Sequence, residues 1–444
     1  MMVQDRNTTK WISTVPEHWK TLRIKNIFAE IDERSETGEE ELLSVSHYTG
    51  VTKKRDSLEN EDDFISNAKT LVGYKKVAEN DLVSNIMLAW NGSLGISKYD
   101  GITSPAYCVY RIKGENNPHY YGYLFSTAIM KAEFRKKSFG IIDSRLRLYS
   151  DKFFSIPVAV PPKVEQDQIV FYIKAQSKKI KHFIQKKQVF IELLKEQRQA
   201  VISRAVTKGI NPDVTLKVSG IEWLGEIPEH WELRKLRYCG QCQNGLNKGG
   251  EFFGKGFPFF GYGDIYNNEI LPEIPSGLVE STDEDQANCS VKKGDVFFTR
   301  TSEIVDEIAI ASTCHETIPN ATFSGFLIRF RPTANLLYEG YSTYYFRNEL
   351  LREYFVKEMN IITRASMSQD LLKSLPIVLP PIEEQVMIYN FIKTETAKID
   401  QAIAKAEKEI ELIKEYREAM IAEAVVGKLH HKIIKPEVCQ TTSL

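Results

Sequence analysis

Long apolar runs, a cysteine framework and a basic excess are all missing from this sequence. None of its apolar runs approaches the roughly 18 residues of a membrane span, and the N-terminus has no charged-then-apolar signal pattern. Six scattered cysteines fit a reducing compartment better than a disulfide framework. The formal net charge is −1, whereas a lone nucleic-acid binder usually carries a basic excess. We therefore expect a cytoplasmic protein, and any DNA binding would have to use local basic surfaces.

Catalytic and metal-binding motifs are also missing. The sequence has no Gly-x-x-x-x-Gly-Lys-Ser/Thr loop, no Glu-x-Lys triplet, no Asn/Asp-Pro-Pro-aromatic motif and no His-Glu-x-x-His. Cys239 and Cys242 form a lone Cys-x-x-Cys, whereas a zinc ribbon needs a second pair. We expect no catalytic residues, no metal site and no bound cofactor, and we interpret these two cysteines as structural thiols.

An internal repeat dominates what is present. Pro-Glu-His-Trp occurs at 16–19 and again at 228–231. A longer match pairs residues from 145 onward with residues from 364 onward without a gap, and each copy contains Pro-Pro-x-x-Glu-Gln. The interiors, 26–140 and 238–359, are much less alike. The chain therefore consists of two half-units with a shared frame. We interpret His18 and His230, which belong to this frame, as core or hinge residues rather than ligands.

The segments after each Pro-Pro predict long helices. Residues 163–206 and 382–425 contain no glycine or proline, and their apolar residues recur at steps of 3, 4 or 7. The first segment has a net charge of +6 and the second of −4, which favours packing of one on the other. Short β-rich runs such as 294–302 and 323–332 predict a twisted, mostly antiparallel sheet in each interior.

Together these features resemble the specificity subunit of type I restriction–modification systems. The resemblance rests on the two Pro-Glu-His-Trp segments, on AWNGSLGISKYDGITSPAY at 89–107, on GDVFFTRTS at 294–302 and on the two Pro-Pro-x-x-Glu-Gln helix starts. It implies an α+β fold in which two target-recognition domains are separated by an antiparallel coiled coil, with a pseudo-twofold repeat. The expected divisions are a first domain at 1–160, a helix at 161–207, a second domain at 208–379, a helix at 380–426 and a tail at 427–444.

The resemblance also implies a function and partners. Each domain would read one half of a bipartite double-stranded DNA site, and the helix pair would set the spacer. Two modification subunits with S-adenosylmethionine would methylate adenine, and restriction subunits with ATP and Mg²⁺ would complete the complex. The chain itself would be a non-catalytic subunit without membrane association.

Base reading requires Arg, Lys, Asn and similar side chains at groove depth, with phosphate contacts setting the register. The candidates in the first domain are Trp90, Asn91, Lys131, Arg135, Lys136, Lys137, Ser144, Arg145 and Arg147. Those in the second domain are Asn247, Lys248, Lys255, Arg300, Thr301, Thr363 and Arg364.

Two other functions remain open at this point. The chain could be a coiled-coil scaffold that binds only proteins, or a stand-alone enzyme with an unrecognised site. Methyl transfer or cleavage by the isolated chain would favour the enzyme. Failure to bind double-stranded DNA even with modification subunits would favour the scaffold.

Overall fold

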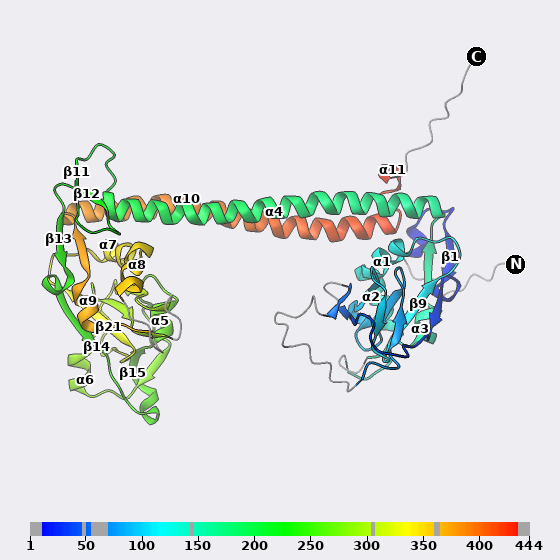
Figure 1. Cartoon of the computed structure of the whole chain (residues 1–444), viewed down its shortest axis with the longest axis horizontal. Coiled ribbons are helices and arrows are strands. Elements are labelled where there is room, and N and C mark those ends of the chain that lie inside the picture. Colours follow the sequence, from blue (N-terminus) through cyan, green and yellow to red (C-terminus); the bar gives the residue numbers. More distant parts are fainter. Residues whose placement is uncertain are drawn as a thin grey trace, which may run out of the picture. The chain divides into compact units, whose positions relative to one another are not determined.

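The computed structural model describes residues 11–46, 50–54, 70–142, 146–302, 307–358 and 365–433. The chain folds into two compact units. Unit 1 comprises 1–187 and 408–444, and unit 2 comprises 188–407. Each unit thus contains one strand-rich domain and part of each long helix (Figure 1). Among the described helices, none combines the length and apolarity needed to cross a membrane.

The domain of unit 1 is built on a four-stranded antiparallel sheet. Its order is β2 (Phe28–Ile31), β9 (Tyr107–Ile112), β6 (Leu82–Asn85) and β7 (Leu94–Ile96). Smaller antiparallel pairs join β1 (Lys20–Arg23) to β10 (Pro157–Val160), β3 (Leu43–Ser46) to β4 (Gly50–Lys53), and β5 (Lys75–Val77) to β8 (Gly101–Thr103). Helices α1 (Pro118–Ser126), α2 (Ala128–Lys137) and α3 (Ser150–Ser155) complete the domain.

The domain of unit 2 has a sheet of the same order, β14 (Gly240–Asn244), β21 (Leu327–Pro332), β17 (Val296–Thr299) and β19 (Ala311–Thr313). Further strands are β11 (Leu216–Val218), β12 (Glu226–Pro228), β13 (Glu232–Lys235), β15 (Phe253–Phe260), β16 (Gly277–Val279), β18 (Thr301–Ser302), β20 (Thr322–Phe323), β22 (Ala365–Ser366) and β23 (Pro376–Leu379). Among the described strand pairs only β15–β20 is parallel. The helices are α5 (Tyr262–Tyr266), α6 (Asp283–Asn288), α7 (Glu339–Phe346), α8 (Glu349–Glu358) and α9 (Gln369–Ser374).

An ion pair occupies the same place in both four-stranded sheets. Arg111 on β9 bonds to Asp81 just before β6, with Nη2 to Oδ2 at 2.9 Å. Arg331 on β21 bonds to Asp295 just before β17, with Nη2 to Oδ2 at 2.6 Å. Both aspartates are buried. The repeat read from the sequence is therefore a repeat of sheet order and of the contacts that hold the strand ends.

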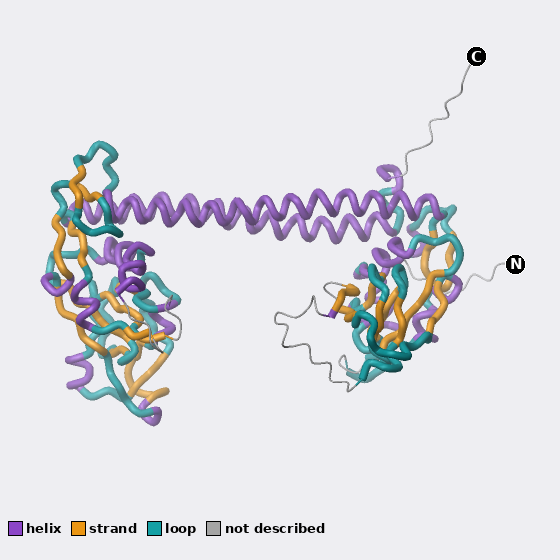
Figure 2. Tube along the Cα trace, viewed as in Figure 1, coloured by secondary structure: helices purple, strands orange, loops and turns teal. Residues whose placement is uncertain are grey.

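Two long helices, α4 (Lys163–Lys208) and α10 (Ile382–Val425), follow the two domains and pack together (Figures 1 and 2). In unit 1 the apolar seam of α4, including Ile169, Ile173 and Ile180, belongs to one core with Met420 and Val425 of α10. The pairing is antiparallel, because the first part of α4 meets the last part of α10. This confirms the predicted helix pair, and burial of the apolar seam between the two helices stabilises both of them.

Charges line the rim of the helix pair as their opposite signs predicted. Lys187 lies 2.5 Å from Glu409 in unit 1, and Arg198 Nε lies 3.1 Å from Asp400 Oδ1 in unit 2. Such partly exposed pairs contribute at most about 1 kcal/mol each, so they select the register more than they stabilise it. The lysine-rich stretch 178–187 thus has at least one lysine directed at the acidic helix.

Candidate nucleic-acid interface and the repeated junctions

The two repeated motifs of unit 1 bond to each other. Trp19 Nε1 donates to Glu165 Oε2 at 2.9 Å, and His18 Nε2 lies 2.7 Å from Glu165 Oε1. Trp19 closes the Pro-Glu-His-Trp segment, whereas Glu165 lies in the first turn of α4, where the helix dipole favours a carboxylate. We call His18, Trp19 and Glu165 the first junction. It fixes the start of the domain to the helix that follows its end.

Unit 2 contains the same arrangement. Trp231 Nε1 donates to Glu384 Oε2 at 3.0 Å, and His230 Nε2 lies 2.8 Å from the same oxygen. We call His230, Trp231 and Glu384 the second junction. Both tryptophans are buried, with Trp231 at 0% exposure. The repeated residues therefore form the same set of contacts in both units, and each set fixes a domain to its long helix.

The neighbouring glutamines hold the domain by backbone contacts. Gln166 Nε2 donates to the carbonyl of Pro161, and its Oε1 accepts from the backbone N–H of Asn117 at 2.8 Å. Gln385 repeats this with the carbonyl of Pro380 and the backbone N–H of Tyr338, again at 2.8 Å. Both glutamines are almost fully buried, so these bonds satisfy amides that would otherwise destabilise the fold. They explain why Glu-Gln repeats as a unit.

The last turn of each long helix bonds to a domain tyrosine and reaches a junction. Tyr120 in unit 1 donates its hydroxyl to the carbonyl of Val425 at 2.9 Å, and Tyr341 in unit 2 donates to the carbonyl of Val206 at 3.2 Å. Gly427 and Gly209 then turn with φ of 79° and 73°. A Cβ on Gly427 would lie 3.2 Å from Trp19, and one on Gly209 3.3 Å from Trp231, so each helix ends tightly against a junction tryptophan.

The prediction that His18 and His230 are core or hinge residues is wrong for the core. The side chain of each is 48% exposed. Their rings stay at the surface because only the nitrogen that meets the carboxylate is needed, while the adjacent tryptophan supplies the buried apolar area. The repeat in the sequence identifies the two glutamates but not their role. Their repetition together with the His-Trp pairs was the available signal.

Four of the DNA-contact candidates of the first domain gather on one surface. Trp90 and Asn91 lie in the short 3-10 helix Ala89–Asn91, beside α2. The guanidinium of Arg135 lies over the Trp90 ring, 5.1 Å from its centroid. A Cβ on Gly92 would lie 2.6 Å from Lys131 Cε, which places that lysine at the same turn. Arg135 and Asn91 are exposed, so this surface offers a cation and an amide side by side.

The other described first-domain candidates make separate contacts. Lys136 and Lys137 are exposed at the end of α2, and Lys136 pairs with Glu133 at 3.1 Å. Arg147 is partly buried, forms backbone hydrogen bonds with Phe139 and donates from its guanidinium to the carbonyl of Leu146. Ser144 and Arg145 lie outside the described residues.

The second-domain candidates fall into two groups. Asn247 and Arg300 flank Gly325: a Cβ there would collide with the Asn247 amide, and Arg300 Nη1 lies 3.5 Å from the Gly325 carbonyl. Phe326, next in the chain, is 62% exposed, so an aromatic ring stands beside these polar groups. Thr301, on β18, follows Arg300 directly and pairs with β22.

The two second-domain lysines meet at Glu280. Lys248 donates to its backbone carbonyl at 2.8 Å, and Lys255 lies 3.1 Å from its carboxylate. Lys248 also pairs with Asp285 at 2.6 Å, and this hydrogen bond holds the pKa of Asp285 below its ordinary value. Both contacts of Lys248 thus lie within its own domain, whereas the side chain of Lys255 is exposed. Thr363 and Arg364 lie outside the described residues, so their role as DNA contacts stays a prediction.

The Cys-x-x-Cys pair lies at the domain core. Cys239 is fully buried, and its thiol points to the carbonyl of Lys235. Burial raises the pKa of Cys242 to about 11. A protonated, buried thiol is a poor nucleophile and a poor metal ligand.

Comparison with known proteins agrees with this architecture. The family model for the type I restriction modification DNA specificity domain matches twice, at residues 16–192 and 228–412. The chain is 26% identical over 447 residues to the specificity subunit of the type I restriction enzyme MjaVIII of Methanocaldococcus jannaschii, covering 94% of both. It is 22% identical over 285 residues to the EcoKI specificity subunit of Escherichia coli, covering 62% of this chain and 58% of that one.

Two solved structures show the same fold. One, from work on complex assembly and conformational transition of the type I restriction–modification system, has a TM-score of 0.65 at 15% identity and covers 93% of this chain and 98% of its own. The HsdS subunit from Thermoanaerobacter tengcongensis has a TM-score of 0.56 at 16% identity and covers 94% and 98%. With its duplicated sheet, paired helices and two family domains, this chain belongs to the DNA-recognising specificity subunits of type I restriction–modification systems.

Proposed function

We propose that each domain reads one half of a bipartite duplex DNA site, and that the two halves differ in sequence. The observation that carries this proposal is a shared frame around unlike surfaces. Sheet order, junctions and helix contacts recur in both units, whereas the surface around Trp90 and Arg135 differs from the one around Gly325. Dimeric DNA binders use symmetric halves for symmetric half-sites, so two unlike surfaces on one frame fit an asymmetric site.

Within the first domain, we propose Arg135 and Asn91 as the main contacts to bases or phosphates. Both are exposed, and the Trp90 ring restrains the guanidinium of Arg135, which lowers the entropy lost on binding. In the second domain Asn247, Arg300 and Lys255 take these roles. The near-neutral net charge suits a chain that supplies sequence contacts while partner subunits supply most of the non-specific grip on DNA.

A substitution of Arg135 tests the first surface. Arg135→Ala should weaken specific DNA affinity by about 1–3 kcal/mol if the guanidinium reads a base, and relax preference at one position. If it contacts a phosphate, binding should weaken across all sequences and the salt slope should fall by about one. Lys152→Ala, an exposed basic residue on α3, is the matched control. Equal affinity for wild type and Arg135→Ala would exclude this surface.

The proposed partners and cofactors follow the family. Two modification subunits carrying S-adenosylmethionine would methylate adenine, and restriction subunits using ATP and Mg²⁺ would cleave. A target adenine must leave the stack to be methylated, so that pocket would belong to the modification subunits. The complex would act on DNA in the cytoplasm.

We further propose that α4 and α10 set the spacer between half-sites. The pairs Lys187–Glu409 and Arg198–Asp400 place residues 190–196 of α4 opposite residues 401–407 of α10. Deleting both seven-residue segments shortens each helix by about 10 Å, since the rise is 1.5 Å per residue. The spacer should shorten by no more than about three base pairs, given about 3.4 Å per base pair. The base sequences of both half-sites should stay unchanged. A change in those sequences would refute the proposal that the helix pair sets the spacer.

Methylome sequencing of a host that carries this chain with its modification subunit tests the whole proposal. The expected result is one bipartite motif with modified adenine in both halves. Replacing residues 26–140 by the interior of another family member should change one half of the motif only. Methylation without sequence preference, or methyl transfer or cleavage by the purified chain alone, would overturn the proposal.

A further inference from the structure

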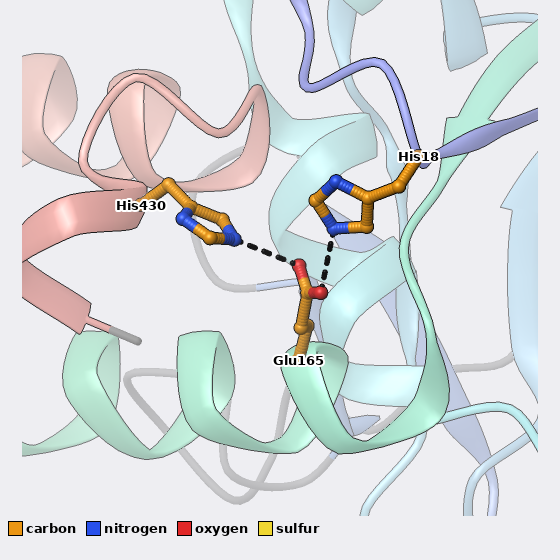
Figure 3. Close-up of side chains that lie close together, drawn as sticks. All are labelled: His18, Glu165 and His430. Carbon is orange, nitrogen blue, oxygen red and sulfur yellow. Dashed lines mark hydrogen bonds and ion pairs between the residues drawn. The ribbon is translucent and has the colours of Figure 1, made fainter. Parts of the chain in front are cut away.

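A third side chain reaches the first junction from the other end of the chain. His430 is the first residue of α11 (His430–Ile433), just beyond α10. Its Nε2 lies 3.3 Å from Glu165 Oε2, while His18 Nε2 approaches the other carboxylate oxygen (Figure 3). The two imidazole rings face the carboxylate from different segments, with centroids 5.5 Å apart and planes at 74°. Two imidazoles and one carboxylate thus converge on one point.

The His430 nitrogen is not satisfied by this contact. Its Nε2 is buried, and within the described part of the chain it has no hydrogen bond of good geometry. Glu165 Oε2, the nearest oxygen, already accepts the Trp19 Nε1–H at 2.9 Å. A buried nitrogen without a partner destabilises the fold by roughly 1–3 kcal/mol unless something else binds it. Its position beside a carboxylate and a second imidazole indicates a cation.

The ligand set fits zinc. Zn²⁺ binds imidazole nitrogen and carboxylate oxygen at about 2.0–2.2 Å, and two histidines with one glutamate form a known three-ligand class that leaves a position for water. Two ligands of one tetrahedral zinc ion therefore lie about 3.4 Å apart. The three ligand atoms here lie within 4.8 Å of one another, so the widest pair would have to close by up to about 1.4 Å, a movement that rotation of the partly exposed histidine side chains can supply. Mg²⁺ and Ca²⁺ prefer all-oxygen ligands and fit poorly.

The surroundings meet the other requirements of a metal site. The Trp19 N–H bond orients the carboxylate, which is the part that outer-shell donors play around bound metals. The side chains of His18 and His430 are 48% and 35% exposed, so an ion has an entry path and its fourth position can hold water.

We propose that His18, Glu165 and His430 bind one divalent transition-metal ion, with zinc the best fit. The ion would connect the start of the first domain, the first turn of α4 and the segment after α10. It would hold α11 to the first junction by metal coordination, where His430 alone makes no hydrogen bond of good geometry. Neither catalysis nor DNA contact would depend on the ion. The site differs from the sequence-based expectation of no metal, because its third ligand is 265 residues from the second and belongs to no spacing motif.

The second junction provides an internal control. It has the same His–Glu–Trp contacts, and Gly209 meets Trp231 as Gly427 meets Trp19. Three residues beyond Gly427 stands His430, whereas three residues beyond Gly209 stands Pro212, which has no donor atom for a metal. The junction itself therefore forms without a third ligand, and only the first should bind the ion.

The experiment titrates Zn²⁺ into untagged, chelator-treated full-length chain by calorimetry, with Co²⁺ absorption as a probe of tetrahedral coordination. Wild type should bind one ion at this site, and His430→Ala should weaken that binding at least about tenfold, since even outer-shell losses cost 10–100-fold. His230→Ala and His431→Ala should bind as wild type does. The His430→Ala variant should keep its fold, because the second junction stands without that ligand.

Two results would overturn the proposal. One is the absence of Zn²⁺ binding by wild type when the Zn²⁺ concentration reaches the order of 0.1 mM, roughly 10–100 times a micromolar concentration of the chain. The other is binding that His430→Ala and His18→Ala leave unchanged, which would place the ion on other histidines or cysteines. Hydrogen exchange adds a separate readout: Zn²⁺ should slow exchange in residues 427–433 of wild type and leave it unchanged in His430→Ala.

Discussion

Removing the carboxylate of the second junction should destabilise unit 2 measurably. The Trp231 ring is fully buried, and its indole N–H donates to Glu384 at 3.0 Å. Glu384→Ala leaves this donor without that acceptor, which costs about 1–3 kcal/mol. The bond to His230, whose side chain is 48% exposed, adds at most about 1 kcal/mol. We therefore expect a loss of roughly 2–3 kcal/mol in the free energy of opening.

Hydrogen–deuterium exchange of the full chain measures this loss locally. Amides in the first turns of α10 and in β13 should exchange roughly 30- to 150-fold faster, because 1.4 kcal/mol is tenfold in an equilibrium constant. His230→Ala is the matched control and should accelerate exchange less than about fivefold. Glu384→Gln keeps an acceptor for the indole and should fall between them. If Glu384→Ala and His230→Ala exchanged alike, the tryptophan bond would not be what stabilises the junction.

Three further predictions concern groups inside unit 2. Asp295→Ala should destabilise the unit by about 3 kcal/mol in urea unfolding, because it leaves the guanidinium of Arg331 beside the sheet without its 2.6 Å partner; an unchanged midpoint would contradict this. Burial raises the pKa of Cys242 to about 11 and that of Cys314 to about 12, so both thiols should react slowly with iodoacetamide at pH 8 and quickly once urea unfolds the chain. Burial lowers the pKa of His315 from 6.5, so the unfolded state takes up its proton first and stability should be lost as pH falls below about 6.5; His315→Gln should reduce this loss in pH-dependent thermal melts.

The frame of the molecule could be predicted because it is written twice. Matching positions in the two copies predicted the helices, and short β-rich runs such as 294–302 predicted central strands. Arg111–Asp81 and Arg331–Asp295 are also repeated, yet no local pattern links residues that far apart. The same limit hid the junctions, since Trp19 and Glu165 are 146 residues apart. Contact between two repeated motifs is a three-dimensional fact, although their joint repetition was a clue.

The DNA surfaces were less predictable for a different reason. A basic residue in a strand–turn segment can face solvent or satisfy an acid of its own domain, and the sequence does not distinguish these. Lys248 pairs with Asp285, whereas Lys255 is exposed despite its contact with Glu280. Arg135 differs from the other basic candidates in that its guanidinium stacks on Trp90, a contact that the sequence does not predict. The predicted core position of His18 and His230 is wrong because the burial of each neighbouring tryptophan does not extend to the imidazole ring.

The long loops that the junctions close have a kinetic consequence. Trp19 and Glu165 close a loop of 146 residues, and Trp231 and Glu384 one of 153. Closing a flexible loop of that length costs about 4 kcal/mol in chain entropy, more than the junction bonds return. Each junction should therefore form only after its domain has folded and brought the ends together. Weakening a junction should then speed unfolding and leave the folding rate almost unchanged, so these bonds set how long a folded domain stays attached to its helix.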